Sequence, residues 1–127
     1  MVRTLKVDVG KRGEALAAAY LEKQGYRIVA RNFRNKLGEI DIIAQDKDVV
    51  CFVEVRTRQG ALEHELALAS VNIFKQKKLS RLAVSFLKKN NLTNEKARFD
   101  VVAVSLRGQE NPILLIKDAF PVVERYA

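Results

Sequence analysis

The chain of 127 residues has one cysteine, one histidine, two prolines and no tryptophan. A single cysteine, Cys51, excludes an internal disulfide and any zinc site built from several cysteines. It lies in the strand-like run VVCFVEV, so we expect it to be buried in a core and not to be a reactive thiol. A histidine-based metal site or a Ser-His-Asp triad would depend on His64 alone, and no nucleophile-elbow motif is present. Both kinds of site are poor explanations of the sequence.

Long apolar runs are also missing. No run approaches the roughly 20 residues that a transmembrane helix needs, and the N-terminal segment MVRTLKVDVGKRG lacks the apolar stretch of a signal peptide. We therefore expect a cytoplasmic protein without membrane association. The composition is 48% apolar and 30% charged, as in globular proteins, and the chain shows no repeat or linker. We expect residues 1–127 to form one domain.

Positive charge is in excess, with 23 Lys and Arg against 15 Asp and Glu and a net charge of +8. Such an excess attracts polyanions and accelerates their association. Nucleic acid is a better candidate partner than a membrane surface, because no long amphipathic helix with an aromatic anchor is visible. A basic row in the second predicted helix would supply a binding surface, although a solvated charged face is the common alternative. Its members are Lys77, Lys78, Arg81, Lys88 and Lys89.

Hydrophobic periodicity and chain-breaking residues predict the order helix, three strands, helix, two strands. The first helix should run from Val9 to Gln24, with Asp8 as its N-cap and Gly25 as its stop. Three antiparallel strands, a crossover helix and a parallel strand make an α/β fold with a mixed sheet flanked by helices. The other expected elements are strands at Tyr26–Phe33, Leu37–Gln45 and Val49–Arg58, an irregular segment after Gln59-Gly60, a helix at Ser70–Lys89, a strand at Ala97–Leu106, a turn at Gly108–Pro112 and an apolar run at Ile113–Ile116.

The hairpin formed by the second and third strands carries acidic residues. Alternate side chains of a strand share a face, so Glu54 and Arg56 should point the same way. On the second strand Glu39, Asp41 and Ile43 should lie together, opposite Ile40 and Ile42. If the hairpin closes symmetrically about Lys47-Asp48, Asp41 falls opposite Glu54 and Glu39 falls opposite Arg56.

Opposed like charges destabilise a strand pair, so Asp41 and Glu54 indicate a compensating cation. Mg²⁺ with retained waters suits two carboxylates best. The alternative is a solvated face that the two acids merely share, but the neighbouring runs IDIIA and CFVEV are as apolar as strands covered on both faces. Glu14 adds a third acid on an otherwise apolar helix stripe, where it either approaches the sheet or turns to solvent.

Gly38-Glu39-Ile40-Asp41, followed by Phe52-Val53-Glu54-Val55-Arg56-Thr57-Arg58, resembles the PD-(D/E)xK nuclease signature, in which an Asp on one strand precedes Glu-x-Lys on the next. The wider pattern resembles the YraN-type family of uncharacterised bacterial proteins, which are similar to archaeal Holliday junction resolvases. The resemblance runs from about residue 10 to 106 and implies a restriction-endonuclease-like fold. Its other matching segments are Gly10-x-x-Gly13-Glu14, Gly25-Tyr26, Ala30-Arg31-Asn32-Phe33 and Arg98-Phe99-Asp100-Val101-Val102.

The resemblance also implies roles for individual residues. Asp41 and Glu54 would bind Mg²⁺ or Mn²⁺, with the Val55 carbonyl as a third ligand. Glu14 would help to hold the metal or its water. The other implied roles are contacts of Lys75 and Gln76 with the scissile phosphate or a flanking one, backbone-phosphate contacts for Arg58 and Arg98, and a local structural role for Asp100.

One departure concerns Arg56, which stands where the nuclease signature has Lys. Arginine stays protonated and differs from lysine in reach and geometry. Arg56 would stabilise charge on the phosphate or make a structural pair with Glu39. Two functions follow: a Mg²⁺-dependent endonuclease for branched or otherwise structured DNA, or a nucleic-acid-binding module that keeps the fold without cleavage. Resolvase-like relatives act as two-fold dimers, so a homodimer is implied by analogy.

Overall fold

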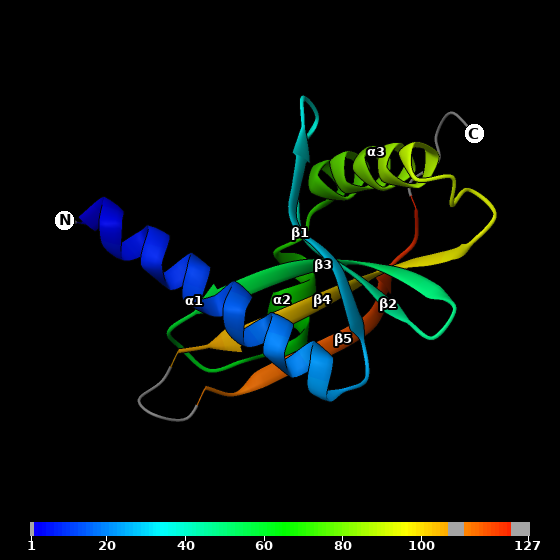
Figure 1. Cartoon of the computed structure of the whole chain (residues 1–127). Coiled ribbons are helices and arrows are strands. Elements are labelled where there is room, and N and C mark those ends of the chain that lie inside the picture. The colour runs from blue at the N-terminus through cyan, green and yellow to red at the C-terminus, as the bar shows by residue number, and fades with distance from the viewer. Residues whose placement is uncertain (1, 107–110, 123–127) are drawn as a thin grey trace.

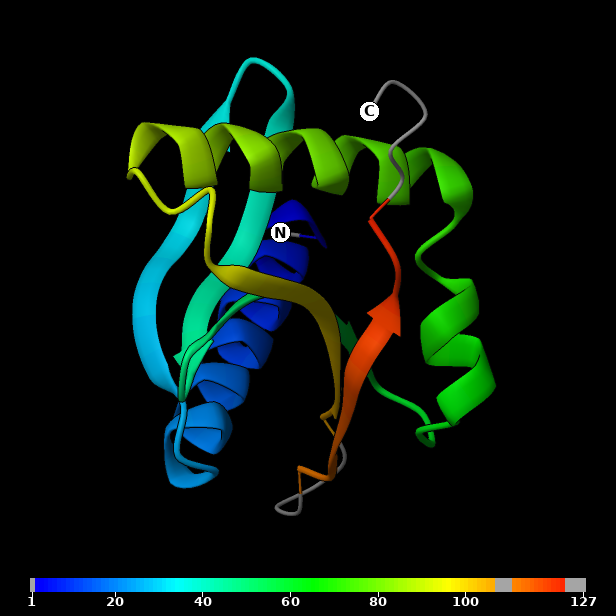
Figure 2. The same ribbon diagram turned by 90° about the vertical axis from the view of Figure 1, so that its right-hand side faces the viewer.

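The computed structural model describes residues 2–106 and 111–122. In this part of the chain three helices and five strands form three layers, with a mixed sheet in the middle (Figures 1 and 2). The elements are α1 (Val2–Lys23), β1 (Arg27–Asn35), β2 (Gly38–Asp46), β3 (Val49–Arg58), α2 (His64–Ala69), α3 (Ile73–Lys89), β4 (Lys96–Ser105) and β5 (Ile113–Phe120).

The sheet has the order β1-β2-β3-β4-β5, with β3 and β4 parallel and every other neighbouring pair antiparallel. Helix α1 covers one face and packs mainly on β3 and β4, while α2 and α3 cover the other (Figures 1 and 2). Each face has its own apolar core, and Cys51 is fully buried in the core under α1, as expected. The expected α/β fold with a mixed sheet is therefore confirmed. No helix within the described ranges is long and apolar enough to cross a membrane.

Helix α1 is longer than its sequence signals indicate. The predicted stop is confirmed: Gly25 has φ +96°, and the amides of Gly25 and Tyr26 donate to the carbonyls of Glu22 and Leu21. The predicted start is wrong, because the helix begins at Val2 and Asp8 lies inside it. Residues 2–8 include no proline or glycine, so the helix continues through them and does not start at Asp8, although aspartate suits an N-cap.

The second predicted helix is in fact two. A short helix, α2, occupies part of the segment expected to be irregular, and α3 begins only at Ile73. At the junction the Ser70 hydroxyl donates to the Ala67 carbonyl, and the Asn72 side chain accepts a hydrogen bond from the Lys75 amide at 3.0 Å. Asn72 is therefore the N-cap of α3, and the chain turns between the helices. Apolar periodicity does not reveal this break, because both helices contribute to one core.

The strand predictions are confirmed within a few residues, and Val49–Arg58 is matched at both ends. Strand β5 extends four residues beyond the predicted Ile116, to Phe120. Its last part contains Lys117 and Asp118, whose charges hide the strand in a hydrophobicity pattern. The turn predicted at Gly108–Pro112 falls mostly on residues 107–110, which lie outside the described residues.

The β1–β2 hairpin bends where Asn32 faces Asp41. Asn32 has a left-handed backbone (φ 55°), and the register pairs on either side of it are Phe33 with Ile40 and Arg31 with Ile42. Ile40 and Ile43 belong to the core under α3, whereas Ile42 belongs to the core under α1. The expectation that Ile40 and Ile42 share a face is therefore wrong, because the bend interrupts the alternation.

Beyond this bend the hairpin tip stands beside α3 (Figures 1 and 2). The Asn35 side chain donates to the Ser85 hydroxyl at 3.3 Å. A Cβ added to Gly38 would lie 3.5 Å from Leu82. The bend thus draws one end of β2 away from β3 and towards the helix.

Candidate functional site

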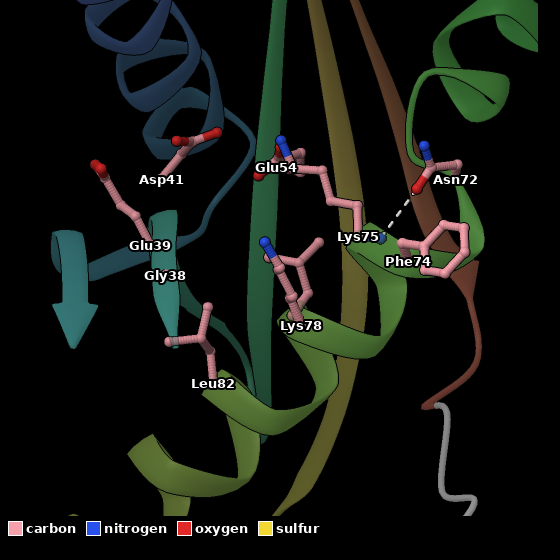
Figure 3. Close-up of a pocket in the computed structure, with 10 residues that line it drawn as sticks. Gly38, Glu39, Asp41, Glu54, Asn72, Phe74, Lys75, Lys78 and Leu82 are labelled. Carbon is pink, nitrogen blue, oxygen red and sulfur yellow. Dashed lines mark hydrogen bonds and ion pairs between the residues drawn. The ribbon is translucent and has the colours of Figure 1, made fainter. Parts of the chain in front are cut away.

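A cleft of about 490 Å³ opens between this diverging end of β2 and the first turns of α3. Figure 3 shows acidic side chains from β2 on one side of it and the lysines of α3 on the other, with Glu54 of β3 between them. The cleft is lined by Gly38, Glu39, Asp41, Glu54, Asn72, Phe74, Lys75, Lys78, Leu79 and Leu82.

Asp41 and Glu54 meet at the point where two strands separate. The β2–β3 register confirms the predicted hairpin, since Ile42 pairs with Val53 and Asp46 with Val49. The paired residues end at Ile42 and Val53, and the next position on each strand is Asp41 or Glu54. There the Asp41 carboxylate accepts a hydrogen bond of 2.8 Å from the Val55 amide. The Asp41 side chain thus provides a hydrogen-bond acceptor for the Val55 amide of β3, beyond the point where β2 and β3 are paired.

The environment of Asp41 favours its protonated form. Burial, followed by the charge of Glu54 and a hydrogen bond with that side chain, raises the pKa of Asp41 to about 8. The Val55 amide opposes this shift. Two carboxyl groups that face each other in a partly buried site cannot both ionise cheaply. Burial and the neighbouring carboxylate therefore favour the neutral form of Asp41 in this arrangement.

Glu14 approaches the same place from α1. Its Oε1 accepts a hydrogen bond of 3.2 Å from the Asn32 side chain, and its pKa is raised by burial, by Glu39 and, less strongly, by Glu54. The close packing of Gly13 on Thr57 brings α1 against β3 here: a Cβ at Gly13 would lie 1.9 Å from the Thr57 Oγ1. The structure thus supports the reading in which Glu14 faces the site and does not turn to solvent.

Two cations contact Glu54, which is only 4% exposed. The Lys75 Nζ lies 2.5 Å and the Arg56 guanidinium 3.5 Å from the same oxygen, Oε2. Arg56 also donates to the Ser70 carbonyl at 2.8 Å, and its buried Nε has no hydrogen-bond partner among the described residues. Glu39 pairs with Arg34, at 3.3 Å, so the alternative of a structural pair between Glu39 and Arg56 is wrong.

The donor set fits a particular kind of cation site. Within residues 2–106 and 111–122 no three acidic, histidine or cysteine side chains are arranged to hold a metal ion. Asp41 and Glu54 supply two hard oxygen donors, and a cation between them would relieve the repulsion that raises the pKa of Asp41. Such a pair suits Mg²⁺, which keeps several waters when one or two carboxylates bind it.

Other residues singled out from the sequence lie elsewhere. Gln76 donates to the Val71 carbonyl at 2.9 Å and so supports the first turn of α3. Arg58 is exposed at the end of β3 and lines a separate hollow beside α2 with Arg56. Val55 contacts Asp41 through its amide, and its carbonyl remains only a predicted ligand. The phosphate contacts assigned to Gln76 and Arg58 likewise stay predictions.

Arg98 lies in a polar network near the start of β4, where it pairs with Cys51 of the parallel strand β3. Its guanidinium contacts Asp46 and Asp100 at 2.9 Å and the Tyr26 hydroxyl at 2.9 Å. Asp100 is fully buried and also accepts from the Tyr26 hydroxyl and the Asp118 amide, so it has the structural role expected of it. The network does not include Asp41 or Glu54, and the phosphate contact of Arg98 stays a prediction.

Sequence reasoning missed four residues of the site: Asn32, Asn72, Phe74 and Lys78. Asparagine favours left-handed backbone and helix N-caps, so Asn32 and Asn72 carried a signal. Lys78 was noted only as part of a basic row. Phe74 carried no signal, because an apolar residue near a helix start is normally assigned to the core.

Comparison with known proteins identifies relatives along most of the chain. A family model described as "Uncharacterised protein family UPF0102" matches residues 13–104. A UPF0102 protein of Syntrophus aciditrophicus (strain SB) is 47% identical over 117 residues, which cover 92% of this chain and 91% of the relative. Another, of Geotalea uraniireducens (strain Rf4), is 48% identical over 114 residues, which cover 89% of each chain. The chain therefore belongs to the uncharacterised protein family UPF0102, in agreement with the YraN-type resemblance.

Proposed function

We propose that this protein is a Mg²⁺-dependent endonuclease that acts on DNA, with branched or otherwise structured DNA as its preferred class. The observation that carries the proposal is the carboxyl pair of Asp41 and Glu54, placed across a cleft from the lysines of α3. Acidic ligands for a metal and cations for a phosphate on opposite walls are what phosphodiester hydrolysis needs.

In this proposal Asp41 and Glu54 hold the metal, which would polarise the phosphodiester and lower the pKa of the attacking water. Lys78 contacts the phosphate from the opposite wall, and Lys75, which pairs with Glu54 in the structure, would be available to contact it if Glu54 bound a metal. Glu14 has a raised pKa and accepts the proton that the water loses. The oxygen of the water forms a bond to phosphorus while the bond to the leaving sugar oxygen breaks, and that oxygen takes a proton from solvent.

Arg56 has a supporting place in this scheme. Its charge is permanent, so it cannot act as the general base. Its contacts with Glu54 and the Ser70 carbonyl hold it beside the carboxyl pair. From there it stabilises negative charge on the phosphate, as cationic clamps do.

A second candidate, a nucleic-acid-binding module without cleavage, is favoured by one observation. Glu54 already has two cationic partners, Lys75 and Arg56, and these compensate its charge without any metal. A site of that kind would bind a phosphate group through Lys78 and other lysines of α3 that do not contact Glu54, and it would not cleave the nucleic acid.

The test is cleavage of a panel of linear duplex, single-stranded, flapped and four-way junction DNAs with Mg²⁺, Mn²⁺ or EDTA. The proposal expects metal-dependent cleavage of at least one DNA and its loss in the Asp41→Asn, Glu54→Gln double variant. The same variant should lose Mn²⁺ binding in isothermal titration. Cleavage that survives the double change, or DNA binding without cleavage under every condition, would reject the endonuclease, and the second result would favour the binding module.

A further inference from the structure

Phe74 is the second residue of α3 and is 72% exposed, more than any other large apolar side chain in the described residues. The other five phenylalanines of the chain lie in or against the core under α3. Phe74 therefore contributes little to the packing of the fold. Its exposure matters because the ring lines the cleft, where aromatic side chains commonly form part of a binding site.

The surroundings of the ring are cationic. The Lys77 Nζ lies 5.9 Å from the ring centroid, and Phe74 lines the cleft together with Lys75 and Lys78. Figure 3 shows the ring on the α3 side, beside Lys75 and across the cleft from Asp41. Proteins commonly bind unpaired nucleotides with an aromatic face, on which a base stacks, next to basic side chains that contact the phosphate backbone of the nucleic acid.

We infer that Phe74 stacks on an unpaired base of a nucleic acid whose phosphates contact the lysines of α3. In a duplex both faces of an internal base are covered by its neighbours, so the ring finds a partner only at a single-stranded segment, flap or branch. The inference rests on the proposed function and specifies its substrate class: DNA with an unstacked nucleotide close to the reacting phosphate.

A second copy of this chain is the competing occupant, because the neighbouring Ile73 is also exposed, by 49%. Charge argues against it. Lys77 lies over the ring, Lys75 and Lys78 line the same cleft, and the whole chain carries a net charge of +8. Two such surfaces repel each other, whereas a polyanion is attracted.

The test measures fluorescence anisotropy in EDTA, so that binding is read without metal or cleavage. The probes are a single strand of about 20 nucleotides, its blunt duplex and the same duplex with a flap. Stacking on one base contributes a factor of about 5 to 150 in affinity. Phe74→Ala should therefore weaken binding to the flapped and single-stranded probes about tenfold or more and change duplex binding less than twofold. Phe74→Tyr should bind like the wild type.

Two controls separate stacking from general apolar contact. Phe74→Leu keeps an apolar side chain without a ring and should behave like Phe74→Ala. Val84→Ala, at an exposed position on the same helix (42% exposed), should change nothing. A 2-aminopurine in the flap should lose fluorescence on binding the wild type and keep it with Phe74→Leu.

Equal affinity of Phe74→Ala or Phe74→Leu and the wild type for the flapped probe would overturn this inference alone. A wild type that binds none of the probes would overturn the proposed function as well. A dimer in sedimentation that becomes a monomer in Phe74→Ala would assign the ring to a contact between two copies and overturn the stacking.

Discussion

Glu54 and Asp41 differ in how their charges are compensated. The Glu54 carboxylate has two cations at one oxygen, whereas Asp41 has a single backbone amide and the repulsion of Glu54. Burial and the charge of Glu54 therefore favour the proton-bound form of Asp41. A metal that bound between them would displace this proton, so metal binding and protonation should compete.

This difference predicts how stability depends on pH when metal is removed. The folded pKa of Asp41 lies near 8 and so above its value in the unfolded chain. The contribution of protonated Asp41 to the stability of the metal-free fold is therefore complete below the unfolded pKa of this group. It is lost as the pH rises through about 8. Asp41→Asn should flatten this dependence and exceed the wild type by several kcal/mol in the free energy of unfolding at high pH. Denaturant titrations in EDTA between pH 5 and 9 measure it, and an unchanged profile would contradict the protonation of Asp41.

Arg56 gives a second prediction at this scale. Arg56→Lys restores the residue of the nuclease signature and should keep or raise Mg²⁺-dependent cleavage. Arg56→Ala should slow single-turnover cleavage about 100- to 1,000-fold, the loss typical of one electrostatic stabiliser, with nearly unchanged Mn²⁺ affinity. Wild-type rates in Arg56→Ala would limit Arg56 to its contacts with Glu54 and Ser70. An inert wild type whose Arg56→Lys variant cuts would identify a binding module derived from a nuclease.

At the scale of elements, helix α1 is held in place by a glycine. Gly13 lets the helix approach β3 so closely that a Cβ would overlap Thr57. Glu14 follows directly in the chain, so this contact also sets how far the carboxylate reaches towards Asp41 and Glu54. The depth of α1 on the sheet thus determines both packing and the geometry of the site.

Two glycines of α1 provide a matched pair of variants. Gly13→Ala must push Thr57 or the helix aside and should destabilise the fold by about 1–3 kcal/mol. Gly10→Ala meets nothing within 4 Å and should stabilise the helix by about 0.5–1 kcal/mol. Thermal unfolding compares them, and Thr57→Ala should recover part of the loss in Gly13→Ala. Similar stabilities of the two single variants would contradict the close packing.

For the whole molecule, the question is which surface faces the nucleic acid. The cleft and the lysines of α3 lie on one side of the sheet, whereas Arg98 is engaged by Asp46 and Asp100 in a separate network. The resemblance predicts a phosphate contact for Arg98, but its ion pairs indicate a structural role. Salt dependence separates the two, because each phosphate contact releases counterions.

The logarithm of the DNA affinity should fall with the logarithm of salt concentration by about 0.9 per phosphate contact. Lys78→Ala should make this slope shallower by about one unit, whereas Arg98→Ala should leave the slope unchanged and lower the melting temperature. Anisotropy titrations between about 50 and 200 mM salt measure the slope. If only Arg98→Ala made the salt dependence shallower, the nucleic-acid interface would have to be assigned to the network of Arg98, Tyr26 and Asp100 instead of the cleft.

Much of the fold could be predicted because it depends on local chemistry. Alternating and apolar runs define β2, β3 and β4, and Gly25 stops α1 because its left-handed backbone suits glycine. The meander and the parallel crossover follow from the order of the elements. The opposition of Asp41 and Glu54 follows from the length of a hairpin whose polar turn is short.

Tertiary structure determined the features that depend on contacts between residues far apart in the sequence. The left-handed Asn32 bends the hairpin, separates Ile40 from Ile42 and opens the gap that Asp41 fills. The positions of Lys75, Arg56 and Phe74 around that gap depend on where α3 starts and how it packs, over long sequence separations. The sequence by itself determined which elements form and which two acids face each other, because these are short-range consequences of pattern and turn length. Only the packed fold decided which cations and which aromatic ring meet them, because that depends on how the layers fit together.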